Sequence, residues 1–406
     1  MSSLREGEVW GEITEASLNR LLERKGVARN TRGTMTSLTQ SKEDQAKKEA
    51  APKPKTSFFA MSKETTARFA RGFADMNPLY HKDGYAKKSP WGRIIAPPAT
   101  ICYAETVNGA TDGFPGCHTI WRGVTYDWKR PMFADEVVKS TTYLEDVYLL
   151  DDSNFAGGKA AVQNYATDIT TFEDELIGTY RTSWHRFSRS GAKKSSKYAG
   201  IERHIWTDEE LDGVWQEYHE QNLKNRRGAE PLYFEDVQVG DEVPYIIKGP
   251  VTLTSKIAFE MAFGAFGWFV GHELALALWE KAPRLPIRNE ENVPEPPVAI
   301  HWTNERCQTY LGMPGAYEAG FERLNWLTQL INNWMGDHGK LRQLDCQFRG
   351  FHWQGDACRL FAEVTGTRVE DGEHLVDLKI WTQSHPRGQR TTDGTMVVEL
   401  PSKADA

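Results

Sequence analysis

The sequence predicts an α+β protein with two domains of the same architecture, each made of a buried helix followed by antiparallel strands. The chain has 406 residues, more than one ordinary domain needs. In the first half, a predicted helix is followed by strand-like runs with Gly, Pro and Asp between them, at 119–128, 137–149, 160–168 and 176–187. The same order of parts begins again near residue 231.

Composition places the chain among globular proteins. Hydrophobic residues make up 39%, charged residues 26%, and the net charge is -7, which argues against nucleic-acid binding. The five cysteines are widely spaced and form no Cys-x-x-Cys pair, so we expect no disulfide framework and no metal site. The most apolar stretch, 261–270, is too short to span a bilayer. We expect a cytoplasmic protein without membrane contact.

Four regions follow from the distribution of polar and apolar residues. Residues 1–55 form an arm with a short helix at 12–24 and a polar linker, and 56–190 form the first domain. Residues 191–230 hold a second linker and a helix that Thr207 opens as N-cap, with acidic residues in its first turn. Residues 231–406 form the second domain.

In the first domain, apolar residues at helical spacing predict a helix over 65–74, and Asn77-Pro78 ends it. Pro98 opens a buried helix over 99–107.

The second domain begins with a sheet entry at 233–241. A helical, aromatic-rich segment follows at 253–279, and then a proline-rich extended insertion at 283–297. The remaining predicted elements are a second central helix and three strands, at 315–335, 344–351, 359–369 and 374–382.

The stretch from Asp75 to His81, Asp-Met-Asn-Pro-Leu-Tyr-His, puts a carboxylate, an amide and an imidazole on one short loop stiffened by proline. A carboxylate and an imidazole can share a water and act as base and acid near neutral pH. The chemistry indicated is proton transfer to or from carbon. An aspartate before Asn-Pro is also a common helix-end or turn residue, so a purely structural role is the alternative.

The segment 69–100, FARGFADMNPLYHKDGYAKKSPWGRIIAPPAT, resembles the MaoC-like enoyl-CoA hydratases and acyl dehydratases, in particular their fatty-acid-synthase-type branch. The resemblance implies two hot-dog domains in tandem, each an antiparallel sheet wrapped around a central helix. In the family, the Asp and His of Asp-x-Asn-Pro-aliphatic-His hold the water that is added. Here Tyr80 stands in the place of that histidine and His81 follows one position later.

By this resemblance, Asp75 and His81 are the acid-base pair, Asn77 holds the loop, and Tyr80 is the alternative proton donor. In members of the family, a backbone N–H at the start of the central helix polarises the thioester carbonyl. Proline has no N–H, so the donors that follow Pro97-Pro98 are Ala99 and Thr100.

The second half is incomplete as a copy of this site. Gly320 falls at the corresponding helix start, and the segment around His301 resembles the one that carries the family's histidine. Pro296 and Val298 stand where the aspartate and asparagine would be. We therefore expect His301 to have a structural or acyl-pocket role, with catalysis by His301 as the alternative.

The predicted function is that of a hydro-lyase which adds water to, or removes it from, an enoyl- or 3-hydroxyacyl-CoA thioester in acyl-CoA metabolism. CoA is carried by the substrate, and no separate cofactor is expected. Fourteen tryptophans and the insertion at 283–297 suggest a bulky acyl group and a catabolic pathway. The alternatives are a noncatalytic acyl-CoA-binding or partner subunit and a hot-dog thioesterase. Homo-oligomerisation is left open.

Overall fold

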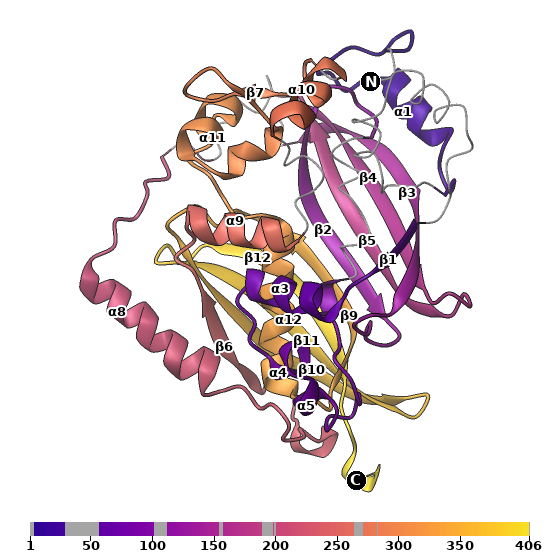
Figure 1. Ribbon diagram of the computed structural model, residues 1–406, viewed down its shortest axis with the longest axis vertical. Helices are drawn as coiled ribbons and strands as arrows, with labels where there is room; N and C mark the ends of the chain where they lie inside the picture. Colours follow the sequence, from indigo (N-terminus) through magenta and orange to yellow (C-terminus); the bar gives the residue numbers. More distant parts are fainter. Residues whose placement is uncertain are drawn as a thin grey trace.

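Ten strands form one continuous antiparallel sheet in the computed structural model, which describes residues 4–28, 57–100, 112–153, 157–188, 198, 200–263, 271–281 and 283–405. Figure 1 shows the sheet curving around helices that lie on its inner side. No helix within these residues is long and apolar enough to cross a membrane. The predicted α+β class is confirmed.

The first half contributes five strands in the spatial order β1-β3-β4-β5-β2. They are β1 (Ser57–Ala60), β2 (His118–Trp128), β3 (Val137–Ser153), β4 (Gly158–Thr170) and β5 (Leu176–Phe187). All four strands after the central-helix region lie where the alternation of apolar and polar residues predicts them. The short edge strand β1 has too few residues for that pattern and was not predicted.

The second half repeats this order as β6-β10-β11-β12-β9. Its strands are β6 (Glu242–Lys248), β9 (Lys340–Phe348), β10 (Ala357–Glu370), β11 (Glu373–His385) and β12 (Arg390–Glu399). In each half the strand that precedes the helices lies at the outer edge, and the first strand after them lies at the inner edge. The two halves therefore have the same topology, which confirms the predicted repeat.

The inner edges of the two halves are paired with each other. Strand β2 runs antiparallel to β9, with residues from Gly123 to Asp127 opposite residues from Gln347 to Gln343. Gly123 is needed here, because a Cβ at this position would lie 2.8 Å from the backbone oxygen of Cys346. Through this pairing, the two five-stranded sheets form one ten-stranded sheet, and the two halves share one interior.

Helix α12 (Gly320–Met335) is the central helix of the second half, and nearly all of its side chains are buried. It begins five residues later than the apolar pattern of 315–335 suggests. Helices α3 (Lys63–Gly72) and α9 (Leu253–Ala262) lie side by side above it in Figure 1. They come so close that a Cβ on Gly72 would lie 2.4 Å from the Cβ of Ala262.

Other expected elements are found with changed limits. The helix of the arm is α1 (Glu15–Leu22), and Thr207 caps α8 (Asp208–Glu217) through a complete capping box with Glu210. The segment 253–279 holds α9 and α10 (His272–Lys281) rather than one helix, and the insertion contains the short strands β7 (Ile287–Arg288) and β8 (Pro294–Glu295). Most of the polar linkers, and residues 101–107 of the predicted first central helix, lie outside the described residues.

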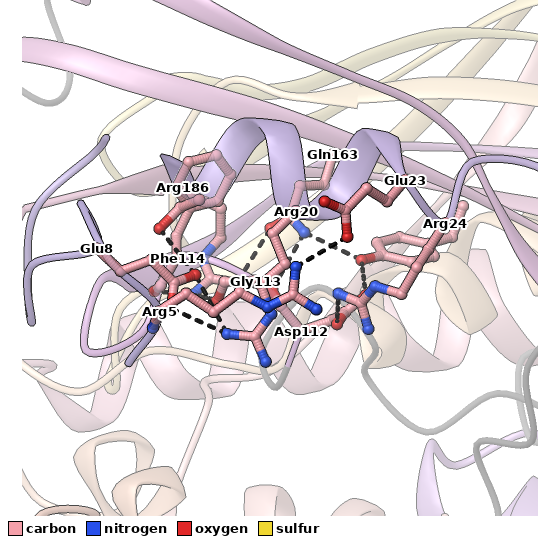
Figure 2. A network of polar contacts seen from close by, with 12 residues as sticks. Arg5, Glu8, Arg20, Glu23, Arg24, Asp112, Gly113, Phe114, Gln163 and Arg186 are labelled. Atoms are coloured by element: carbon pink, nitrogen blue, oxygen red, sulfur yellow. Dashed lines mark hydrogen bonds and ion pairs between the residues drawn. The ribbon is translucent and has the colours of Figure 1, made fainter. Parts of the chain in front are cut away.

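Arg186 organises the loop that leads into β2, as Figure 2 shows. Its side chain is 2% exposed and donates to the backbone oxygens of Asp112 (2.8 Å) and Phe114 (2.9 Å) and to Oε1 of Gln163 (3.0 Å). The Asp112 carboxylate in turn accepts from Arg24 of the arm at 2.9 Å. Residues 4–28 are thus tied to the first sheet and are not simply a linker.

We predict that Arg186→Met lowers the free energy of unfolding by about 3 kcal/mol, because several buried acceptors lose a charged donor at once. Urea unfolding followed by circular dichroism measures this loss. The matched control is Arg122→Met, which removes an exposed arginine bonded to Tyr148 and should cost less than about 1 kcal/mol. Equal losses in the two variants would contradict the role given to Arg186.

Candidate functional site

The Asp75 loop follows directly after α3, through Ala74 in a left-handed backbone conformation at φ 59°. Asp75 is 2% exposed, and its Oδ1 accepts from the backbone N–H of Asn77 at 2.9 Å. The Asn77 side chain accepts from the N–H of Leu79 at 3.1 Å and caps the one-turn helix α4 (Pro78–His81). Asn77 therefore braces the loop. Pro78 begins α4 but does not end α3 as expected from the sequence, because α3 already stops at Gly72, before the left-handed Ala74.

His81 lies against the main chain of Asp75 rather than against its carboxylate. Its Nε2 is 2.8 Å from the Asp75 backbone oxygen. A carbonyl oxygen only accepts, so Nε2 carries the proton and Nδ1 is left as an acceptor when the ring is neutral. The two predicted catalytic residues are neighbours, but their side chains are not directly hydrogen-bonded to each other.

Tyr80 points into the interior between the two halves. It is 1% exposed, and its hydroxyl accepts from Nδ2 of Asn332 on α12 at 2.9 Å. Burial, followed by the charges of Asp75 and Asp337, holds the pKa of Tyr80 well above 10. The phenol stays protonated, which keeps Tyr80 available as a proton donor.

Side chains of the second half hold this first-half loop in place. Lys248 at the end of β6 is 3% exposed, and its ammonium donates to the backbone oxygen of Phe73 at 2.8 Å. Arg226 donates to the backbone oxygen of Met76 at 3.1 Å. Burial raises the pKa of Asp75, while the positive charge of Lys248 acts against that rise.

A pocket runs beside the loop, between the first sheet and the C-terminal end of α12. Its walls are mostly apolar, with three basic residues at Lys129, Arg130 and Lys340. Asn77 and Tyr80 line it, whereas Asp75 and His81 belong to the same loop but are not part of its lining. The apolar and aromatic part of the wall includes Leu79, Trp91, Ile95, Trp128, Met132, Ile169, Ile177, Met335 and Leu341.

The two oxyanion candidates of the first half differ in what they can donate. The backbone N–H of Thr100 is already bonded to the oxygen of Pro97 at 2.9 Å, so Thr100 does not offer that group. Its hydroxyl lines the pocket and is buried without a partner among the described residues. Ala99 therefore remains the candidate for a backbone N–H that donates to the thioester oxygen.

In the second half, His301 ends a 3₁₀ turn over Pro297–His301, and its Nδ1 lies 2.9 Å from the Tyr317 oxygen. Lys256 of α9 bonds the His301 backbone oxygen, and Glu260 accepts from Nε1 of Trp302 at 2.9 Å. Sequence reasoning missed both α9 residues. The signal was a Lys and a Glu four positions apart in an otherwise apolar helix.

Gly320 is the first residue of α12, as the resemblance implies, and the helix has no side-chain cap. Trp121 of the first half packs against it, since a Cβ on Gly320 would lie 2.8 Å from the indole ring. Across the described part of the chain, no group of three or more His, Cys, Asp or Glu residues is placed to hold a metal ion.

The fold agrees with comparisons to known structures. A MaoC-like dehydratase superposes with a TM-score of 0.59 at 13% identity, over 85% of this chain and 96% of that one. A conserved hypothetical protein from Mycobacterium tuberculosis, described as having a double hot-dog fold, gives 0.51 at 8% identity, over 87% and 97%. A MaoC-like dehydratase from Phytophthora capsici gives 0.50 at 10%, over 86% and 95%. The chain therefore has the double hot-dog fold.

A family model matches part of the first half. Residues 56–177 match the family model described as the FAS1-like dehydratase domain region. The match covers the Asp75 loop and most of the first sheet. The comparison with curated proteins gave no match. This match confirms the resemblance to acyl dehydratases that the segment 69–100 indicates.

We predict that deprotonation of Lys248 makes the folded protein more stable at alkaline pH than at pH 8. Burial lowers the pKa of Lys248 from 10.5 to about 8, so between these pH values the unfolded chain binds a proton that the folded chain does not. The free energy of unfolding should rise by about 3 kcal/mol from pH 8 to 10.5, at roughly 1.4 kcal/mol per pKa unit.

Denaturant unfolding across this pH range, compared between wild type and Lys248→Met, isolates the contribution of Lys248, because other titrating groups are common to both. The variant should lack most of the rise. Lys82→Met, at an exposed lysine of the same loop, is the control and should follow the wild type. Parallel curves for wild type and Lys248→Met would show that Lys248 does not titrate as described.

Proposed function

We propose that the protein is a hydro-lyase that adds water to an enoyl thioester, or removes it from a 3-hydroxyacyl thioester, with Asp75 and His81 as the base and the acid. The observation that carries this proposal is the loop between Asp75 and His81, which is held by both halves beside an apolar pocket. The match of 56–177 to a dehydratase domain region supports the reaction class.

The pocket is suited to an acyl chain. Its wall is mostly apolar and includes two tryptophans, Trp91 and Trp128, which favour a bulky or unsaturated group. Lys129 lies at the pocket and is exposed, so its ammonium is placed to meet an anionic part of the thioester carrier. We propose an acyl-CoA as that substrate.

In the proposed reaction, the Asp75 carboxylate takes a proton from water while the water oxygen bonds to C3 of the enoyl group. Burial makes the carboxylate a stronger base, and Lys248 favours its ionised form at neutral pH. His81 delivers a proton to C2, and Tyr80 is the alternative donor. The N–H of Ala99 and the hydroxyl of Thr100 are the proposed donors to the thioester oxygen.

One specific observation favours a second candidate function, that of a noncatalytic acyl-binding subunit. Tyr80 replaces the histidine of the family pattern, and His81 is turned toward the main chain of Asp75. A chain that binds acyl thioesters in the pocket without turning them over would have no need for a free imidazole. Binding without turnover is the outcome that separates this function from the first.

We predict that Asp75→Asn and His81→Ala each lower kcat for hydration by about 10²- to 10⁴-fold, the usual contribution of one positioned acid or base. Loss of the absorbance of the enoyl thioester measures turnover, with substrates from crotonyl-CoA to aromatic and polycyclic enoyl-CoAs. Asp83→Asn removes an exposed carboxylate that pairs with Lys63 and is the control, with unchanged turnover expected.

The same panel decides between the candidate functions. Release of free CoA in place of hydration would indicate a thioesterase. Turnover that survives Asp75→Asn and His81→Ala would place the chemistry outside this loop. Tight binding of the thioesters by wild type without any turnover would favour the binding subunit.

A further inference from the structure

Tyr80 and Asn332 meet on the wall of the pocket, although they come from different halves of the chain. Tyr80 lies on α4 of the first half, and Asn332 lies near the C-terminal end of α12 in the second half. Both side chains line the pocket and are buried, with exposed fractions of 1% and 8%. Nδ2 of Asn332 donates to the Tyr80 hydroxyl oxygen at 2.9 Å. The proposed reaction gives Asn332 no role.

This hydrogen bond decides what the Tyr80 hydroxyl can still do. A phenol carries one O–H donor, and its oxygen can also accept. Because Asn332 is the donor here, the phenol oxygen is used as an acceptor and the O–H remains available. The described part of the chain shows no acceptor for this O–H. A buried polar hydrogen needs an acceptor, and since Tyr80 lines the pocket, a ligand in the pocket can supply it.

His81 is placed differently. Its ring is half-buried and is not part of the pocket lining, and Nε2 donates to the Asp75 backbone oxygen at 2.8 Å. To give this proton to a ligand, His81 would have to break that bond. The bond instead fixes the main chain that carries the Asp75 carboxylate. His81 therefore has the geometry of a positioning residue, whereas Tyr80 has that of a donor to the pocket.

Tyr80 also lies close to the proposed base. Burial is the largest cause of the raised pKa of Tyr80, and the nearby charges of Asp75 and Asp337 add to it, whereas the bond from Asn332 acts in the opposite direction. A donor to the phenol oxygen stabilises the phenolate, so Asn332 helps Tyr80 to release its proton. The carbanion that forms next to a thioester is a stronger base than a phenolate, so even a weakly acidic phenol can protonate it.

We propose that Tyr80 delivers the proton to C2 and that Asn332 of the second half positions it, while His81 acts through the Asp75 main chain. The hydration reaction itself rests on the proposed function, and only the identity of the proton donor changes, from His81 to Tyr80. Asp75 takes a proton from water as the water oxygen bonds to C3. The electron pair of the former double bond takes the phenol hydrogen, so the O–H bond of Tyr80 breaks and a C2–H bond forms. Proton return from Asp75 to the phenolate through solvent restores both groups, and one water has been added.

The test measures kcat and KM for hydration by Tyr80→Phe, by Asn332→Leu, by the double variant, and by His81→Ala and His81→Gln. Phenylalanine keeps the ring of Tyr80 and removes only its hydroxyl. Glutamine keeps an N–H donor for the Asp75 oxygen but cannot release a proton. Calorimetry with butyryl-CoA, which cannot be hydrated, shows whether each variant still binds a thioester. Asn333→Leu, at a buried asparagine beside Asn332 that does not line the pocket, is the matched control.

We expect Tyr80→Phe to lower kcat by about 10²- to 10⁴-fold, with little change in the binding of butyryl-CoA. Asn332→Leu should lower kcat by roughly 10- to 100-fold, the effect of one hydrogen bond to a charged group. In the Tyr80→Phe background the same change should have no further effect, because Asn332 acts through the Tyr80 hydroxyl. His81→Gln should recover most of the activity that His81→Ala loses, and Asn333→Leu should leave kcat unchanged.

A loss of kcat in Tyr80→Phe that is no larger than the loss in His81→Gln would overturn the assignment. With Asp75→Asn still impaired, that result would leave the proposed function standing, with His81 as the acid. Failure of Tyr80→Phe to bind butyryl-CoA would likewise count against a donor role, and additive losses in the double variant would remove the positioning role of Asn332. If wild type hydrates no substrate while it still binds butyryl-CoA, the proposed function and the donor role of Tyr80 fail together.

Discussion

The ammonium group of Lys248 holds the Asp75 loop of the first half against the sheet of the second. A buried lysine is costly unless its donors are used, and here it bonds the backbone oxygen of Phe73 where α3 ends and faces the Asp75 carboxylate. Arg226 and Asn332 make further contacts with the same loop. The loop geometry is therefore a property of both halves together, and neither half alone would fix it.

Because the two halves have the same topology, the Asp75 loop of the first half and the His301 segment of the second half can be compared. Their residues differ. In the first half, Asp75 and Asn77 match the family pattern, but Tyr80 stands where a histidine is expected. The second keeps a histidine, His301, and lacks the aspartate. Glu260 and Lys256 come from α9, the counterpart of α3, so these two buried ionisable residues of the second half lie on a helix rather than on a loop.

Most of the fold was predictable because its strands and helices follow from local sequence patterns, such as apolar alternation and helix caps. The alternation in 119–128 and 176–187 defines β2 and β5, and Thr207 with Glu210 marks the start of α8. Elements without a local pattern were missed, among them β1 and β12.

The site was less predictable, because its decisive contacts join distant parts of the chain. Lys248 lies 175 positions from Phe73, and Asn332 lies 252 from Tyr80. The orientation of His81 also could not be read from spacing, since it depends on α4 turning the ring back toward the Asp75 main chain.

A crystal structure with butyryl-CoA tests the central claim most directly, since it shows where the acyl chain and the thioester oxygen lie. The account predicts the acyl chain in the pocket between Trp128 and Met335, with the thioester oxygen near Ala99 and Thr100 and the α and β carbons facing the Asp75 loop. An empty pocket, with the acyl chain bound elsewhere, would contradict it.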